Sequence, residues 1–233
     1  MATLTVYPNA DPESTSVDGY VNHIEGGVAF GTLVAGAGTG ASDTTAENEI
    51  VLIDSGINSN TWDEIWRSIF LFDTSPLTAS ATISAATMSI MGTYKFDTFA
   101  TDINLNINIY TSAPASNTAL VAGDYDSLGT TAQSDTAITY ANWLTTPAYN
   151  DFVLNATGLG NISKTAVTKF GARNANYDVA NSAPTWEESK QARLGGNYSD
   201  AAGTSSDPKL VITYTLPAVA GGGASNLLTL NVG

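Results

Sequence analysis

Between residues 103 and 109 the chain alternates strictly between apolar and asparagine side chains. Isoleucine or leucine occupies positions 103, 105, 107 and 109, and asparagine occupies positions 104, 106 and 108. Successive side chains of a β-strand point to opposite faces, whereas a helix would scatter these isoleucines around its circumference. The pattern therefore predicts a β-sheet with one face turned towards a core and the other towards solvent.

Two strand-like segments precede this one. Residues 67–73 are an apolar run too short for a solitary helix, and the run stops at Pro76, so we expect a strand covered on both faces. Residues 86–91 alternate again, but Ile83 is out of phase with them. This mismatch predicts a bulge or a late strand start near Ala85.

The rest of the chain continues the pattern of short strands separated by turn residues. Further strands are expected at 3–7, 17–24, 50–53, 137–143, 151–154, 166–173 and 209–215. Many short strands divided by Gly, Pro, Asn and Asp are typical of an antiparallel sandwich. We predict an all-β fold, an antiparallel β-sandwich of jelly-roll-like form with long loops and a C-terminal extension.

Three regions of the chain are distinguished. Residues 1–61 hold N-terminal strands and Gly-rich loops that are part of the sandwich or packed on it, 62–215 form the sandwich itself, and 216–233 are a flexible spacer followed by a strand. The Gly-rich stretch 25–49 is expected to form long loops or a mobile flap. Single helical turns are expected at 58–66, where Trp62 and Trp66 are four residues apart, and at 155–163.

Composition narrows the function classes. Charged residues are only 13% of the chain, against about 25% in an average protein, and the net charge is −14. The surface must therefore owe its polarity mainly to Ser, Thr, Asn and Gly. Such a composition suits extracellular or particle-surface proteins. A negative net charge repels a phosphate backbone, so nucleic acid is not expected as a partner.

The amino-terminal residues indicate a localisation. They contain neither a basic segment nor an apolar segment of a secretory signal, and no run approaches the roughly 20 apolar residues that cross a bilayer. We therefore expect no membrane insertion. The expected location is a virion assembled in the host cytoplasm and released at lysis, with an extracellular location as the alternative.

Residues that carry catalysis are scarce. His23 is the single histidine, it has no serine or cysteine motif attached, and the chain has no cysteine. A nucleophilic triad needs a base, and zinc sites need several His or Cys ligands. We expect a protein that is not an enzyme, with no cofactor except a structural Ca²⁺.

Calcium is the ion that the loops favour, because it takes oxygen ligands from carboxylates and amides. The preferred ligands are Asp124 and Asp126. Other oxygen-rich loops contain Asp135, the group Asn174, Asn176 and Asp178, and the pair Asp200 and Asp207. None of these loops has the spacing of an EF-hand.

Aromatic residues in or beside polar loops are the candidates for glycan binding. They are Trp143, Tyr177, Trp186 and Tyr198. Such rings stack on pyranose faces in sugar-binding sandwiches, but large aromatics more often pack in a core or at its rim. Both roles are open for these four residues.

The C-terminal segment carries a further apolar alternation. Leu227, Leu228, Leu230 and Val232 follow a Gly-rich spacer, and the last three of them share one face of a strand. A strand this short cannot stand alone, so it must add to a sheet. It either folds back onto its own domain or extends the sheet of a neighbouring subunit, and the second role makes these residues an assembly interface.

Three segments resemble the DNRLRE family of β-sandwich domains, which is similar to a group of carbohydrate-binding modules. They are residues 67–73 (RSIFLFD), 81–90 (ATISAATMSI) and 207–214 (DPKLVITY), and the resemblance spans 62–215. It implies a jelly-roll-like sandwich without catalysis. Residues 152–159 and 169–173 also look like hypothetical proteins of tailed phages. The first sixty residues and the tail after residue 215 depart from the family pattern.

These observations converge on one expectation with two alternatives. The expected function is a non-catalytic virion structural protein, a tailed-phage capsid decoration, head-fibre or tail-surface protein that assembles through its terminal segments. Its partners would be copies of itself and other virion proteins, with surface glycans as a further partner. The alternatives are a secreted carbohydrate-binding module and a cell-surface filament subunit.

Overall fold

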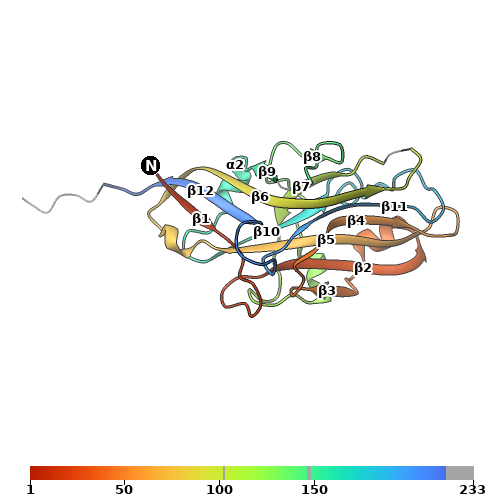
Figure 1. The fold of residues 1–233 in the computed structure, drawn as a ribbon, viewed down its shortest axis with the longest axis horizontal. Helices are drawn as coiled ribbons and strands as arrows, with labels where there is room; N and C mark the ends of the chain where they lie inside the picture. Colours follow the sequence, from red (N-terminus) through yellow and green to blue (C-terminus); the bar gives the residue numbers. More distant parts are fainter. Residues whose placement is uncertain (102, 146–147, 219–233) are drawn as a thin grey trace, which may run out of the picture.

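A computed structural model describes residues 1–101, 103–145 and 148–218. It is an all-β fold, as predicted (Figure 1). The strands are β1 (Ala2–Val6), β2 (Asp18–Val28), β3 (Gly40–Ser42), β4 (Glu47–Ser55), β5 (Trp62–Asp73), β6 (Thr82–Asp97), β7 (Asn106–Thr111), β8 (Ile138–Thr139), β9 (Tyr149–Val153), β10 (Val167–Asn174), β11 (Gln191–Asn197) and β12 (Lys209–Thr215). The helical segments are α1 (Phe30–Ala35), α2 (Ala156–Gly160) and the 3₁₀ turns η1 (Ser75–Leu77) and η2 (Ala122–Ser127). None of the helices in the described ranges is both long and apolar enough to span a bilayer.

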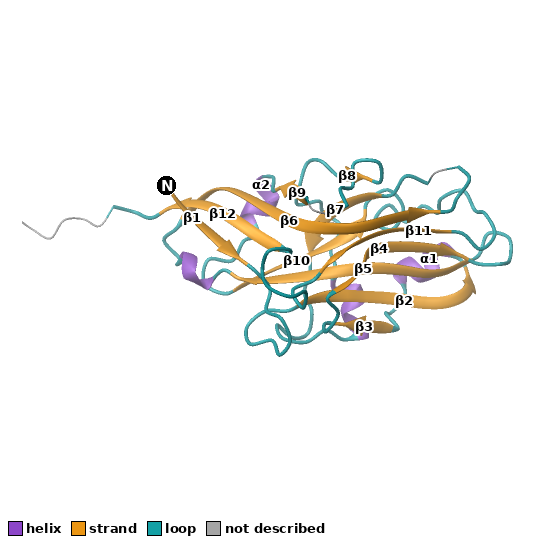
Figure 2. Ribbon diagram, viewed as in Figure 1, coloured by secondary structure: helices purple, strands orange, loops and turns teal. Residues whose placement is uncertain are grey.

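The strands form one antiparallel sheet that curls into a sandwich (Figure 2). Its main path runs β1-β12-β6-β11-β4-β5-β10-β7-β8, with β2, β3 and β9 attached beside it. The long strand β6 pairs with β12 and β9 over its first half and with β11 over its second half. Along β5 the partner changes in the same way, from β4 to β10. The two long strands therefore carry the sheet around a shared core.

The alternating segment 103–109 faces that core as expected. Its four apolar side chains at 103, 105, 107 and 109 are buried. The strand itself begins only at Asn106, because Asn104 adopts a positive φ of 48° that interrupts the extended chain. Asn108 is buried as well, and its Nδ2 donates a hydrogen bond to the Ser134 carbonyl at 3.0 Å. The face predicted to be wet is thus partly covered by the loop between η2 and β8.

The predicted irregularity near Ala85 is confirmed. In the pairing of β6 with β12, Ala85 lies opposite Thr213, whereas Ile83 lies opposite Tyr214. Ser84 is therefore an extra residue on β6, which is the definition of a bulge. The bulge returns Ile83 to a position where it packs against the core.

The helical turn predicted at 58–66 is wrong, because β5 begins at Trp62. Residues four apart share a face in a strand as well as in a helix, so the spacing of Trp62 and Trp66 did not separate the two. The turn predicted at 155–163 is confirmed as α2, whose cap residue Asn155 accepts a hydrogen bond from the Gly158 amide at 2.9 Å.

The Gly-rich stretch 25–49, predicted to form long loops or a mobile flap, has regular secondary structure over much of its length. It contains α1, which buries Phe30 and Leu33, and the edge strand β3. Its glycines permit close packing: a Cβ on Gly38 would lie 2.0 Å from the Ala122 carbonyl oxygen. The stretch therefore packs closely against η2 at this point.

Residues 1–61 contribute β1 to β4 to the same sheet as the rest of the chain, since β1 pairs with β12 and β2 pairs with β5. One strand of that sheet, β11, had no sequence prediction. Its Gly195-Gly196 pair suggests a loop, but Gly195 is covered by the Tyr94 ring, whose carbon atoms a Cβ would approach to 2.2 Å.

Candidate functional site

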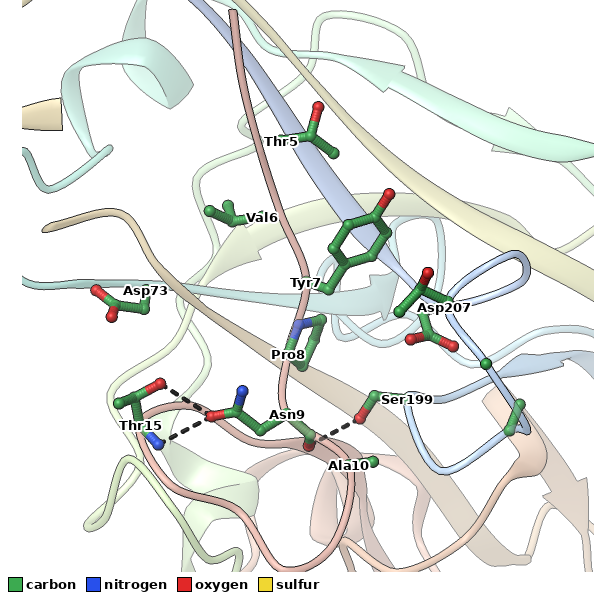
Figure 3. A pocket seen from close by; sticks show the side chains of 13 residues that line it. Thr5, Val6, Tyr7, Pro8, Asn9, Ala10, Thr15, Asp73, Ser199 and Asp207 are labelled. Atoms are coloured by element: carbon green, nitrogen blue, oxygen red, sulfur yellow. Dashed lines mark hydrogen bonds between the residues drawn. The ribbon is translucent and has the colours of Figure 1, made fainter. Parts of the chain in front are cut away.

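An open cleft of about 530 Å³ lies beside the end of β1 (Figure 3). It is lined by Thr5, Val6, Tyr7, Pro8, Asn9, Ala10, Thr15, Asp73, Ser199, Ala201, Gly203, Thr204 and Asp207. The lining combines hydroxyl groups, an amide, carboxylates and one aromatic ring, and it contains no Lys, Arg or His. Such a lining suits ligands that hydrogen-bond or carry positive charge.

A turn after β1 forms one wall of the cleft. Pro8 ends regular pairing, and the Oδ1 atom of Asn9 accepts hydrogen bonds from the Thr15 amide and hydroxyl, each at 2.9 Å. Because Oδ1 is engaged in this way, the Nδ2 group of Asn9 is the part of the side chain that remains for the cleft (Figure 3). The opposite wall is the loop between β11 and β12.

A buried carboxyl group, that of Asp18, lies beneath the wall formed by the loop between β11 and β12. Asp18 is 1% exposed, and its Oδ1 lies 2.5 Å from the hydroxyl oxygen of Ser199. The same hydroxyl lies 2.9 Å from the Asn9 carbonyl, and it has one proton for two acceptors. Burial raises the pKa of Asp18 to about 8, although Ser199 opposes the shift. A protonated Asp18 supplies the second proton, and its raised pKa favours this neutral form.

Asp207 contributes a second carboxyl group, at the cleft itself. It is 4% exposed, and its Oδ1 atom is buried without a hydrogen-bond partner. Burial, together with the charge of Asp200, raises the pKa of Asp207 to about 6. At neutral pH this carboxylate is therefore ionised and incompletely paired.

A different ionic cluster lies inside the sandwich and involves the strands β5 and β10. Arg67 donates from Nε and Nη2 to the two carboxylate oxygens of Asp178 at 2.9 and 2.6 Å, and Arg173 does the same at 2.9 and 2.8 Å. All three side chains are buried. Burial alone would raise the pKa of Asp178, but the two guanidinium groups outweigh it and the pKa is lowered.

The remaining guanidinium protons of this cluster bind the surrounding loops. Arg67 donates to the carbonyls of Val34 and Tyr125, and it lies 3.6 Å above the Tyr125 ring. Arg173 donates to the carbonyls of Leu128 and Gly129. The cluster therefore links α1 and η2 to the sheet through hydrogen bonds. Its three charged side chains are buried, so a substrate has no access to them.

The aromatic residues predicted to bind glycans do not form a common platform. Trp143 and Tyr198 are buried in the core, where neither ring has a face open to a sugar, so this role is wrong for both. Tyr177 and Trp186 are half-buried and pack against the core. Tyr177 donates its hydroxyl to the Ile103 carbonyl at 2.5 Å. None of the four lines the cleft.

Asp124 and Asp126 do not form the predicted calcium site. Asp124 is buried, and its two oxygens accept hydrogen bonds from the amides of Ala115 and Val121, each at 2.8 Å. Its side chain thus closes the turn before η2, and Asp126 is exposed. Within the described ranges, no three His, Cys, Asp or Glu side chains gather as metal ligands.

The predicted assembly residues Leu227, Leu228, Leu230 and Val232 lie outside the described residues. The cleft residues Tyr7 and Asn9 were not predicted from the sequence. Their only local signal is the turn at Pro8, and several of their neighbours in the cleft, among them Ser199 and Asp207, come from the far end of the chain.

No protein family model matches this chain, and no curated protein matches it.

Proposed function

We propose that this chain is a non-catalytic structural protein of a virus particle, a tailed-phage decoration, head-fibre or tail-surface component, which assembles through its C-terminal segment. The observation that carries the proposal is the position of β1. Within the described part of the chain, β1 pairs only with β12, so its other edge can accept a strand.

The strand β12, which precedes the C-terminal segment, ends beside the start of β1. Ala2 of β1 pairs with Tyr214, the penultimate residue of β12, and Leu216 follows with half of its surface exposed. Residues 216–226 can span at most about 3.5 Å each when extended, enough to carry the apolar positions of 227–232 to another subunit. Main-chain pairing of that segment with an open β1 edge would join copies into an assembly.

Truncation after Thr215 tests the assembly. We expect the full chain to form oligomers in light scattering and the truncated chain to be a monomer with unchanged thermal stability. Leu230→Asp should act like the truncation, whereas Thr229→Asp, on the other side of the same alternation, should leave the oligomer intact. A monomeric full chain, or oligomers that survive truncation, would contradict the proposal.

The particle itself is tested separately. Mass spectrometry of purified particles should detect the chain in fixed stoichiometry with the other structural proteins. Its presence only in the culture fluid, free of particles, would instead support a secreted protein.

The cleft favours glycan binding as a second candidate function. The Tyr7 ring, the Asn9 amide and the Asp207 carboxylate line one hollow, and they offer a stacking face, donors and acceptors for sugar hydroxyls. On a glycan array, Tyr7→Ala should then abolish binding, whereas Trp186→Ala, outside the cleft, should not. Retained binding by Tyr7→Ala would exclude this site.

A further inference from the structure

Two carboxylates beside the cleft hold oxygen atoms that the described residues do not satisfy. The Oδ1 atom of Asp207 is buried and has no hydrogen-bond partner. Asp200 accepts a hydrogen bond from the Asp11 amide at 2.7 Å through Oδ1, but its Oδ2 is also buried without a partner. Neither side chain takes part in an ion pair with a cationic residue of the described ranges.

This arrangement is unfavourable for the protein alone. A buried carboxylate without partners loses its hydration and gains no hydrogen bond in return. The nearest cation in sequence, Lys209, has its ammonium group 3.6 Å from the centre of the Tyr149 ring. Burial raises the pKa of Asp207, and repulsion by the charge of Asp200 raises it further.

We propose that Asp200 and Asp207 bind one Ca²⁺ ion beside the cleft, which Asp207 lines. The donors are oxygen atoms only, and Ca²⁺ accepts six to eight oxygens in a flexible arrangement. Carbonyl and hydroxyl oxygens of the cleft wall at 201–204 and water molecules would complete the shell. This proposal is independent of the assembly proposed above.

The proposed site has only two carboxylate ligands. We therefore expect it to bind calcium weakly. Loss of a carboxylate ligand weakens binding, and the sites of extracellular modules have Kd values of roughly 0.1–1 mM. The ion would join the loop that precedes β12 to the loop after β1, because Asp200 already holds the Asp11 amide. Binding would therefore stabilise the fold.

Thermal unfolding of the full chain with and without CaCl₂ tests the site. At a Ca²⁺ concentration about tenfold above Kd, we expect Tm to rise by about 3–6 °C relative to NaCl of equal ionic strength. Asp207→Asn should lose most of this rise while its Tm without calcium stays equal to or above that of the wild type. Asp126→Asn removes the same charge from an exposed position and should retain the full rise.

Terbium provides a second readout that does not depend on stability. Tyr7 lines the cleft and the Tyr149 hydroxyl donates to the Asp207 carbonyl at 3.0 Å, so tyrosine excitation should sensitise bound Tb³⁺. The emission should fall on addition of Ca²⁺ and be absent in Asp207→Asn. No calcium-dependent rise in the wild type, or an equal rise and emission in Asp207→Asn, would overturn the proposal.

Discussion

Asp178→Ala is expected to lower the free energy of unfolding by about 3–5 kcal/mol, the largest effect of any single substitution proposed for this protein. Asp178 accepts four hydrogen bonds from Arg67 and Arg173, and its removal leaves two guanidinium groups buried without a counter-charge. Equilibrium urea denaturation at pH 7 measures the loss. Many of the loop contacts held by the two arginines should open with it.

The control for this prediction is Asp126→Ala. It removes the same charge from an exposed position near Arg67 and should change the free energy of unfolding by less than about 0.5 kcal/mol. A triple variant that replaces Arg67, Arg173 and Asp178 by apolar residues should recover much of the loss, because no buried charge remains. A cost below 1 kcal/mol for Asp178→Ala would mean that water reaches the cluster.

The cluster also predicts acid sensitivity. The pKa of Asp178 is lowered in the folded state, so its stabilising contribution is present above its ordinary pKa of 3.8. That contribution is lost as the pH falls through the lower folded-state value.

Asp18→Asn is expected to stabilise the protein at pH 8 and to remove part of its pH dependence. The pKa of Asp18 is raised from 3.8 to about 8 in the folded state. Its contribution is therefore fully present below about pH 4 and declines as the pH rises towards 8. Asparagine mimics the neutral acid, since its Nδ2 can donate to Ser199 and its Oδ1 can accept from the Ser199 amide.

The measurement is the difference in unfolding free energy between the variant and the wild type across this window. Between about pH 5 and about pH 8 the difference should move in favour of the variant by about 1–3 kcal/mol, at 1.36 kcal/mol for each unit of pKa shift realised. Asp126→Asn serves as the exposed control and should show no such trend. A flat difference for Asp18→Asn would show that Asp18 is ionised at its ordinary pKa.

Local patterns in the chain predicted the framework well. The apolar positions of the alternation at 103–109, the out-of-phase Ile83 and the helical turn at 155–163 all depend on residues close together in the sequence, and each has its expected outcome in the structure. Predictions failed where one sequence pattern is compatible with two kinds of secondary structure. The spacing of Trp62 and Trp66 fits a strand and a helix equally.

The candidate sites could not be predicted in the same way. Trp143 and Tyr198 lie beside polar residues in the sequence, but other parts of the chain cover them in the fold. Asp124 differs from Asp207 only through its partners: nearby amides occupy both oxygens of Asp124, whereas Asp207 retains a buried oxygen without a partner. Neither burial nor partner is visible in a local motif.

The amino-acid sequence by itself therefore determined that this protein is a β-sheet sandwich, because side-chain alternation along a strand is a local property of two-residue period. Only the tertiary structure decided where its chemistry lies. The cleft is lined by Tyr7 and Asn9 together with Ser199 and Asp207, and the buried ionic cluster pairs Arg67 with Asp178. These pairs are more than a hundred residues apart, and sheet pairing between distant strands, not any local pattern, brings them together.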